Sequence, residues 1–290
     1  YYANMVANEM FLDSATLRNS VVAKAKHLGY LPRSAKGSKA VVDLTITPTG
    51  DPAVITIPRF TQFQGDVDGI NYIWCTANAH ALNINANLIY TVSNVELTQG
   101  IPISYRYTAE TADVDQRYLL PNANIDTDTL TVTVQTSKTE SASFAYDLAN
   151  DITTVNSTSR HYFLDEVDEG LYEVQFGDGI LGKEVSNGNI ITLAGLVTDT
   201  TATNGCKNFS TVADVGGYSN VKIVTVDAAG GGAASADIQE IKFNAPKSFD
   251  AQNRCVTVYD YISLVKRDYP AAQSVVAWGG EDSDPPIYGK

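Results

Sequence analysis

Residues 177–184 read Gly177-Asp-Gly-Ile-Leu-Gly-Lys-Glu184, and this stretch decides between two different folds. Its glycines and lysine are spaced almost as in a phosphate-binding P-loop, which has Ser or Thr directly after the lysine. Glu184 stands at that last position, where its carboxylate would repel phosphate oxygens. The flanking sequence must therefore show whether a nucleotide-binding fold is built here.

The flanks of this stretch favour β-structure. Leu171–Phe176 has the pattern of a strand, as a P-loop requires, but no helix-forming run follows the lysine. Instead, Ser186-Asn-Gly-Asn189 contains Asn-Gly, a strong signal for a hairpin turn, and Ile190–Leu193 has the pattern of another strand. We therefore predict a β-hairpin in which glycine supplies the positive φ of a tight reversal, and no nucleotide site.

Period-two alternation of apolar and polar residues runs from about Ala40 to Val226. Leu130, Val132 and Val134 alternate with Thr and Gln, so one face of that strand is predicted to be buried and the other solvated. The density of β-branched and aromatic residues between turn signals indicates an antiparallel sandwich or meander. Further strands are predicted near residues 42–46, 54–57, 70–76, 87–92 and 103–107.

The amino-terminal segment is predicted to be helical. Asp13 is predicted to cap its second helix, along which Leu17, Val21, Ala25 and Leu28 form one apolar stripe. A helix this short is marginal alone, so the stripe must pack either on its own domain or on a partner helix. The sequence leaves these two alternatives open.

The last part of the chain is predicted to be a small α/β lobe. It follows Ala228-Ala-Gly-Gly-Gly-Ala-Ala234, which by composition is a flexible joint. Ser235 is predicted to cap a first helix around Ile238. A second helix is predicted over residues 259–268 and a strand over residues 274–278.

Together these patterns predict an α+β fold that is mainly antiparallel β. The chain divides into a helical arm at residues 1–30, a β-rich domain at 31–158, a β domain with a Phe-Gly-Asp-Gly hairpin at 159–226, and an α/β lobe at 227–290. Because the first residue is not Met and the lobe ends early, we expect the sequence to be a truncated part of a longer protein.

Composition excludes several functions. The 290 residues carry a formal net charge of −13 with no compensating basic run, so neither nucleic acid nor an anionic membrane is expected as a partner. No apolar run is long enough to span a bilayer. Cys75, Cys206 and Cys255 lie far apart without a CxxC pair, which favours buried free thiols over disulfides or a zinc site.

No catalytic, metal or cofactor site is predicted, and no enzymatic activity. No HExxH motif occurs, and none of the three histidines has a partner at metal-ligand spacing: His27, His80 and His161. Paired aspartates occur at residues 113/115, 126/128 and 282/284. None of these pairs continues into a calcium-binding loop, and turn formation with solubility explains them.

Several segments, in order along the chain, resemble one family of phage proteins. They are Ala7–Asp13 with Leu17–Val22, Leu28–Ser34, Tyr172–Gly182 with its Phe-Gly-Asp-Gly signature, and Phe243–Pro246 with Val256–Tyr261. Through them the chain is similar to a baseplate wedge subunit of T-even-like contractile-tailed phages, within the baseplate J-like family. The resemblance covers nearly the whole chain and is weakest between about Thr49 and Thr158.

The resemblance implies a late structural protein without cofactors that lies in the virion tail baseplate and assembles in the host cytoplasm. It implies that the subunit pairs with another copy, joins other wedge proteins through its amino-terminal helices, and forms a ring around the tail hub that rearranges on contraction. The expected partner interface comprises Met5, Phe11, Leu12, Leu17, Val21 and Leu28. The family-signature turn comprises Phe176, Gly177, Asp178, Gly179 and Gly182.

Two other functions stand as alternatives. A virion-surface or secreted adhesin that binds glycans is supported by the acidic, Thr- and Asn-rich β content. The helical arm and the presence of only two tryptophans, Trp74 and Trp278, count against it. A nucleotide-dependent enzyme is supported only by the imperfect glycine stretch.

Overall fold

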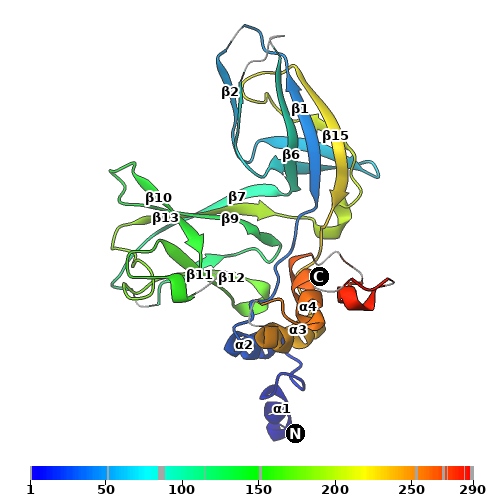
Figure 1. Cartoon of the computed structure of the whole chain (residues 1–290). Helices are drawn as coiled ribbons and strands as arrows, with labels where there is room; N and C mark the ends of the chain where they lie inside the picture. The colour runs from blue at the N-terminus through cyan, green and yellow to red at the C-terminus, as the bar shows by residue number, and fades with distance from the viewer. Residues whose placement is uncertain are drawn as a thin grey trace. The chain divides into compact units, whose positions relative to one another are not determined.

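The computed structural model describes residues 2–50, 52–83, 89–113, 115–149, 152–251, 254–269, 272, 274–283 and 285–287. The chain forms two compact units (Figure 1). The helical unit comprises residues 1–33, 165–172 and 235–290, and the sheet unit comprises residues 34–164 and 173–234. The fold is α+β and mainly antiparallel, which confirms the fold class predicted from the sequence.

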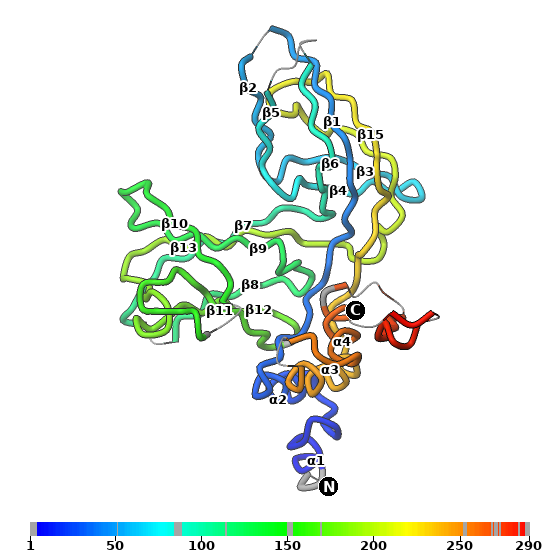
Figure 2. Tube along the Cα trace, in the orientation of Figure 1, coloured from blue at the N-terminus to red at the C-terminus, as the bar shows by residue number. Residues whose placement is uncertain are grey.

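Both compact units are assembled from stretches that are far apart in the sequence, as the Cα trace in Figure 2 shows by its colours. The chain leaves the helical unit after Arg33, returns to it at Asp165, leaves after Tyr172 and returns at Ser235. The four-segment division predicted from the sequence follows the linear chain, and as a statement about domains it stays a prediction.

The sheet unit contains three sheets. The six-stranded sheet has the order β14 (Asn208–Thr211), β3 (Gln62–Val67), β4 (Ile70–Thr76), β6 (Tyr90–Gln99), β1 (Lys39–Ile46) and β15 (Val221–Gly230). The two-stranded sheet pairs β2 (Val54–Ile57) with β5 (His80–Asn83). The seven-stranded sheet has the order β7 (Ile101–Thr108), β13 (Ile190–Val197), β9 (Ile125–Gln135), β10 (Ser143–Leu148), β11 (His161–Glu166), β12 (Tyr172–Phe176) and β8 (Tyr118–Leu120).

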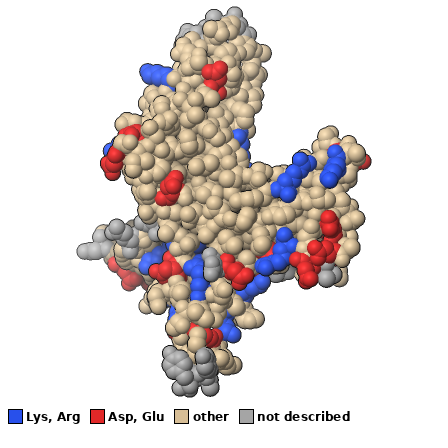
Figure 3. Space-filling model, turned by 180° about the vertical axis from the view of Figure 1, so that it is seen from behind, with Lys and Arg blue, Asp and Glu red and all other residues tan. Residues whose placement is uncertain are grey.

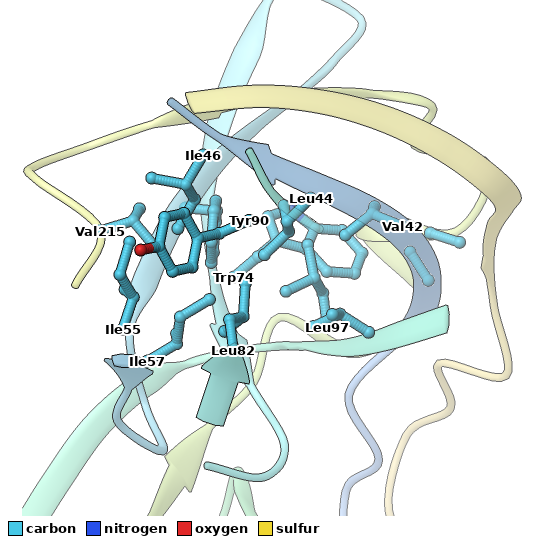
Figure 4. Packing of buried hydrophobic residues seen from close by; sticks show 14 of the residues in the cluster. Val42, Leu44, Ile46, Ile55, Ile57, Trp74, Leu82, Tyr90, Leu97 and Val215 are labelled. Carbon is cyan, nitrogen blue, oxygen red and sulfur yellow. The ribbon is translucent and has the colours of Figure 1, made fainter. Parts of the chain in front are cut away.

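The main core of the sheet unit lies between the six-stranded and two-stranded sheets. Every second residue of β1 is buried, from Ala40 to Ile46, because side chains alternate between the two faces of a strand. Trp74 of β4 and Tyr90 of β6 fill the centre and are fully buried. Figure 4 shows these side chains pointing toward those of β2 and β5. Burying each large apolar side chain contributes about 1.5–3 kcal/mol to stability.

Strand predictions are largely confirmed. The predicted strands at 42–46, 54–57, 70–76, 103–107 and 130–135 lie within β1, β2, β4, β7 and β9. The strand predicted at 87–92 falls partly outside the described residues, and β6 begins at Tyr90. The strands β10 and β11 pair in parallel, with Asp147 opposite His161.

The helical unit contains α1 (Tyr2–Glu9), α2 (Arg18–His27), α3 (Ile238–Ala251) and α4 (Val258–Asp268). Short 3₁₀ turns occur at η2 (Asp168–Gly170) and η4 (Gly280–Asp282) in this unit, and at η1 (Ile152–Thr154) and η3 (Thr200–Thr203) in the sheet unit. Val21, Val22 and Ala25 of α2 pack with Ile241 and Ala245 of α3 in one buried cluster. The stripe on α2 therefore packs on its own unit.

Helix caps differ in part from the prediction. Leu17 is the residue before α2 and is half exposed, so it does not belong to the buried stripe. Asp237 caps α3, because its Oδ1 accepts a hydrogen bond from Glu240 N at 2.7 Å; Ser235 lies too far upstream to do so. Thr257 caps α4 through a capping box with Asp260.

The predicted flexible joint at 228–234 is wrong, because the structure pairs and packs this stretch. β15 continues to Gly230, and Ala233 and Lys36 exchange two backbone hydrogen bonds of 2.8 and 3.1 Å. At Gly232 a Cβ would lie 2.3 Å from both Ser38 Oγ and Thr200 O. Glycine is needed there for close approach of the backbone, not for flexibility.

The strand predicted over residues 274–278 is also wrong. The described residues of this segment pair with no strand, and Val276 and Trp278 are exposed. A strand requires a partner that satisfies its backbone groups. Among the described residues from 235 onward, the carboxy-terminal lobe consists of helices and irregular chain.

Candidate functional site: exposed apolar surfaces of the two units

A buried ion pair holds the three stretches of the helical unit together. Arg18 Nε lies 2.6 Å from Glu166 Oε1, and its Nη2 lies 3.1 Å from Oε2. Arg18 Nη1 also donates to Ala236 O at 2.6 Å. The Glu166 side chain is fully buried; desolvation raises the pKa of its carboxyl, and the Arg18 guanidinium opposes that rise. One α2 side chain thus joins all three stretches.

Two further ion pairs also join the amino-terminal stretch to the other two stretches of the helical unit. Lys26 Nζ lies 2.7 Å from Asp165 Oδ2, and Arg33 Nη2 lies 2.9 Å from both carboxylate oxygens of Glu240. The buried Tyr172 hydroxyl donates to a backbone carbonyl, that of Pro32, at 3.0 Å. The amino-terminal helices therefore have a fixed support within their own unit.

The turn between α1 and α2 is organised by Glu9. Its Oε1 accepts hydrogen bonds from Thr16 N at 2.8 Å and Thr16 Oγ1 at 2.7 Å, and its Oε2 accepts from Leu17 N at 3.3 Å. These hydrogen bonds lower the pKa of Glu9 to about 2, and the bond from the Thr16 hydroxyl has the largest effect. The prediction that Asp13 caps the second helix is wrong, because Glu9 supplies the carboxylate at this turn.

The residues of the expected partner interface fall into two groups. Met5, Phe11 and Leu17 are 47%, 67% and 51% exposed, so they are accessible to a partner. Val21 is 0% exposed, and Leu12 and Leu28 pack against the same buried cluster. The second group supports the arm from within its own unit and does not offer a free surface.

Two exposed residues of the arm were not among the interface residues predicted from the sequence. Val6 and Met10 are both exposed and lie beside the predicted positions Met5 and Phe11. Their apolar character next to those positions was the available signal. A run of exposed large apolar side chains of this kind is typical of a protein-binding surface.

A second exposed apolar surface lies on α4. Val258, Tyr261, Val265 and Tyr269 are exposed and are spaced so that they follow one face of a helix. The sequence indicated a shared face for Tyr261, Leu264 and Val265 but assigned no partner to it; Leu264 is half-buried, whereas the other two are exposed. Figure 3 views the whole molecule from the side opposite to that in Figure 1; on that side, Lys, Arg, Asp and Glu occur in small groups among uncharged residues.

The signature turn is a closely folded loop after β12. Asp178 Oδ1 accepts hydrogen bonds from Ile180 N and Leu181 N, both at 2.9 Å, and these bonds lower the pKa of Asp178. A Cβ on Gly177 would lie 2.3 Å from Leu181 O, so the backbone crosses itself here. Gly179 and Gly182 have φ of +84° and +90°, as the predicted tight reversal requires.

The predicted hairpin around this turn is wrong. β12 pairs with β11 and β8, whereas β13 pairs with β7 and β9, so the two strands that flank the loop are not neighbours. The loop instead closes on itself through one bridge between Gly177 and Glu184. No helix forms between Glu184 and β13, so the helix N-terminus on which a P-loop depends is not built.

The other candidate residues form no chemical site. Among the described residues, no three His, Cys, Asp or Glu side chains lie together as metal ligands. Cys75 and Cys206 are buried free thiols as predicted, and burial raises the pKa of Cys75 to about 12. Cys255 is free but exposed, which corrects the prediction of burial for that residue. Asp284 lies outside the described residues.

The tryptophans do not form a sugar-stacking platform in the described structure, since Trp74 is fully buried and only Trp278 is exposed. None of the described helices combines the length and apolar content needed to cross a membrane. Two exposed apolar helical surfaces on a β-rich chain are typical of proteins that bind other chains.

The comparison with known proteins agrees with this class. The chain is 25% identical, over 298 aligned residues, to the baseplate wedge protein gp6 of Enterobacteria phage T4. The alignment covers 92% of this chain and 43% of gp6, so the chain spans less than half the length of that relative. This confirms the resemblance to a baseplate wedge subunit of T-even-like phages that the sequence motifs predicted.

Comparisons with solved structures and with protein-family models gave weaker results. A chain in the cryo-EM structure of the anti-feeding prophage baseplate is 15% identical to this chain, with a TM-score of 0.27. That match covers 87% of this chain and 48% of the other, and the TM-score is too low to establish a common fold. No protein-family model matches the chain.

Proposed function

We propose that this chain is part of a structural, non-enzymatic subunit of a tail baseplate wedge. It lies in the virion, in the tail baseplate, and assembles in the host cytoplasm. The similarity to the baseplate wedge protein gp6 supports this proposal. Its work is done by contacts with other wedge proteins, with a second copy and, through a ring that rearranges on contraction, with the tail hub.

The amino-terminal arm is the surface for another wedge protein. The observation that carries this assignment is the exposure of Met5, Val6, Met10 and Phe11 on and directly after α1. Glu9 fixes the turn that follows, so the arm is presented from the folded support of α2. A partner helix with an apolar face would remove these side chains from water, which contributes about 25 cal/mol per Å² buried.

Co-assembly with the other wedge proteins tests this role. Met5→Asp with Phe11→Asp should abolish or strongly reduce recovery of the wedge complex, because two charges would be placed in the apolar contact. Val224→Asp with Val226→Asp is the control, since these valines are also exposed apolar residues but lie on β15 of the sheet unit. Unchanged assembly of the arm variant would refute the assignment.

The α4 surface is the proposed contact with a second copy. Tyr261 and Val265 are exposed on one face of this helix. In an antiparallel pair of α4 helices, these side chains of the two copies would pack against each other. This exposed apolar face supports self-pairing through α4.

Sedimentation of the purified chain tests self-pairing. Tyr261→Glu with Val265→Glu should shift the chain from dimer to monomer at micromolar concentration. Val256→Glu with Tyr259→Glu provides a control, because both residues are exposed near α4 but lie outside the proposed stripe. A monomeric unmodified chain, or equal effects of both variants, would contradict pairing through α4. No observation specifically favours the glycan-binding alternative.

A further inference from the structure

Two cations from different loops approach one aromatic ring of the sheet unit. The Arg160 guanidinium carbon lies 3.9 Å from the centre of the Phe144 ring, and Lys183 Nζ lies 6.0 Å from it. Both distances permit cation–π attraction. The two loops are joined, because Lys183 N donates a hydrogen bond to Ser159 O at 2.8 Å. The pair of cations is therefore a fixed feature of this surface.

Arg160 and Lys183 are both exposed, and neither of these two cations has a carboxylate within ion-pair distance among the described residues. Arg117 of the same unit, by contrast, lies 2.7 Å from Glu173. The signature loop also carries the carboxylates of Asp178 and Glu184, but neither forms an ion pair with Arg160 or Lys183, and Asp178 accepts hydrogen bonds from two backbone N–H groups of its own loop.

Apolar side chains accompany these cations. Phe144 is 38% exposed, and Ile180, at the tip of the signature loop that contains Lys183, is 75% exposed. The loop is held in shape by the Asp178 hydrogen bonds and by the backbone crossing at Gly177. A loop that is already ordered loses little conformational entropy when a partner binds to it.

We propose that the signature loop and Phe144 form a docking surface for an acidic segment of another protein chain. Carboxylates of that segment would contact Arg160 and Lys183, and an apolar side chain of it would pack on Phe144 and Ile180. Charge complementarity selects this partner, since both local cations lack carboxylate partners among the described residues.

Fluorescence anisotropy with a labelled peptide of repeated Glu-Leu-Glu units tests the proposal on the full chain. The peptide should bind at low ionic strength, and Arg160→Glu with Lys183→Glu should weaken binding by about tenfold or more. Ile180→Ser should weaken it by about threefold, because part of the apolar contact is lost. The matched Gln-Leu-Gln peptide should bind at least about tenfold more weakly than the acidic one.

The control variant carries Lys207→Glu and Lys222→Glu, two exposed lysines elsewhere on the sheet unit, and has the same net charge as the double reversal. It should bind the acidic peptide within about twofold of the unmodified chain. Unaltered circular dichroism and unfolding temperature would show that each variant folds. The proposal is overturned by absence of binding, by an equal loss in the control, or by equal binding of the Gln peptide. Preferential binding of an oligothymidylate would also overturn it, since the site would then be selective for phosphate.

Discussion

The Arg18 guanidinium binds the Glu166 carboxylate through two nitrogens, although 148 positions separate the two residues in the sequence. The carboxylate is wholly removed from water, and the same arginine also binds Ala236 O. Three distant stretches of chain are thereby joined beneath the amino-terminal arm.

Arg18→Met should destabilise the protein by about 3 kcal/mol, because it leaves a buried carboxylate without its partner. Lys39→Met is the control: Lys39 lies 2.9 Å from Glu96, but both side chains are largely exposed, and we expect a loss of at most about 1 kcal/mol. Denaturant unfolding measures both values. Equal losses of unfolding free energy in the two variants would show that the Arg18–Glu166 pair stabilises the fold no more than an exposed ion pair does.

The Glu9 carboxyl should titrate well below its ordinary pKa, at about 2. Since the folded-state pKa is lowered, the stabilisation of the turn is fully present above the unfolded value of about 4.5 and is lost as pH falls toward 2. Thr16→Val should raise the pKa of Glu9, because the hydrogen bond from the Thr16 hydroxyl contributes most to the lowering of that pKa. Carboxyl NMR titration measures this shift, with Thr158→Val as control; an unchanged pKa in Thr16→Val would contradict it.

Gly232→Ala should destabilise the sheet unit by about 1–3 kcal/mol, because its methyl group would overlap Ser38 and the Thr200 carbonyl. Gly230→Ala, two positions away, should be close to neutral, since a Cβ there meets no atom within 4 Å. Thermal unfolding distinguishes the two variants. If both were neutral, the stretch would behave as the flexible joint that its composition suggests.

Val21→Asp should destabilise the helical unit by more than about 3 kcal/mol, because an unpaired charge would enter the α2–α3 cluster. Leu17→Asp should cost less than about 1 kcal/mol, since Leu17 is half exposed. Circular dichroism during denaturation measures both. A mild effect of Val21→Asp would mean that the stripe is available to a partner after all.

Local patterns in the sequence were sufficient for most elements. The alternation around Val132 predicted β9, and the spacing of Val21 and Ala25 predicted α2, because strand and helix periods are imposed by backbone geometry. The signature turn was also recognised, since Gly179 and Gly182 adopt the positive φ that glycine permits.

Other local signals pointed in the wrong direction. Glycine next to glycine at 230–232 suggested flexibility, yet Gly232 is there because Asn204 and Ser38 approach its backbone. Asn187-Gly188 suggested a hairpin, yet its flanking strands pair with different partners. The local sequence shows that glycine permits tight turns and close backbone contacts. Which segments make those contacts is set by distant parts of the chain.

Sequence patterns were enough to predict the fold class, the β-rich middle of the chain, the absence of a complete P-loop motif and the likeness to a baseplate wedge subunit. Periodicity and short motifs carry that information because they act over a few residues. The folded structure was needed to show that Val21 is buried while Phe11 is exposed, that Glu166 lies against Arg18, and that Arg160 and Lys183 both approach Phe144. These relationships depend on contacts between distant segments, which no local pattern encodes.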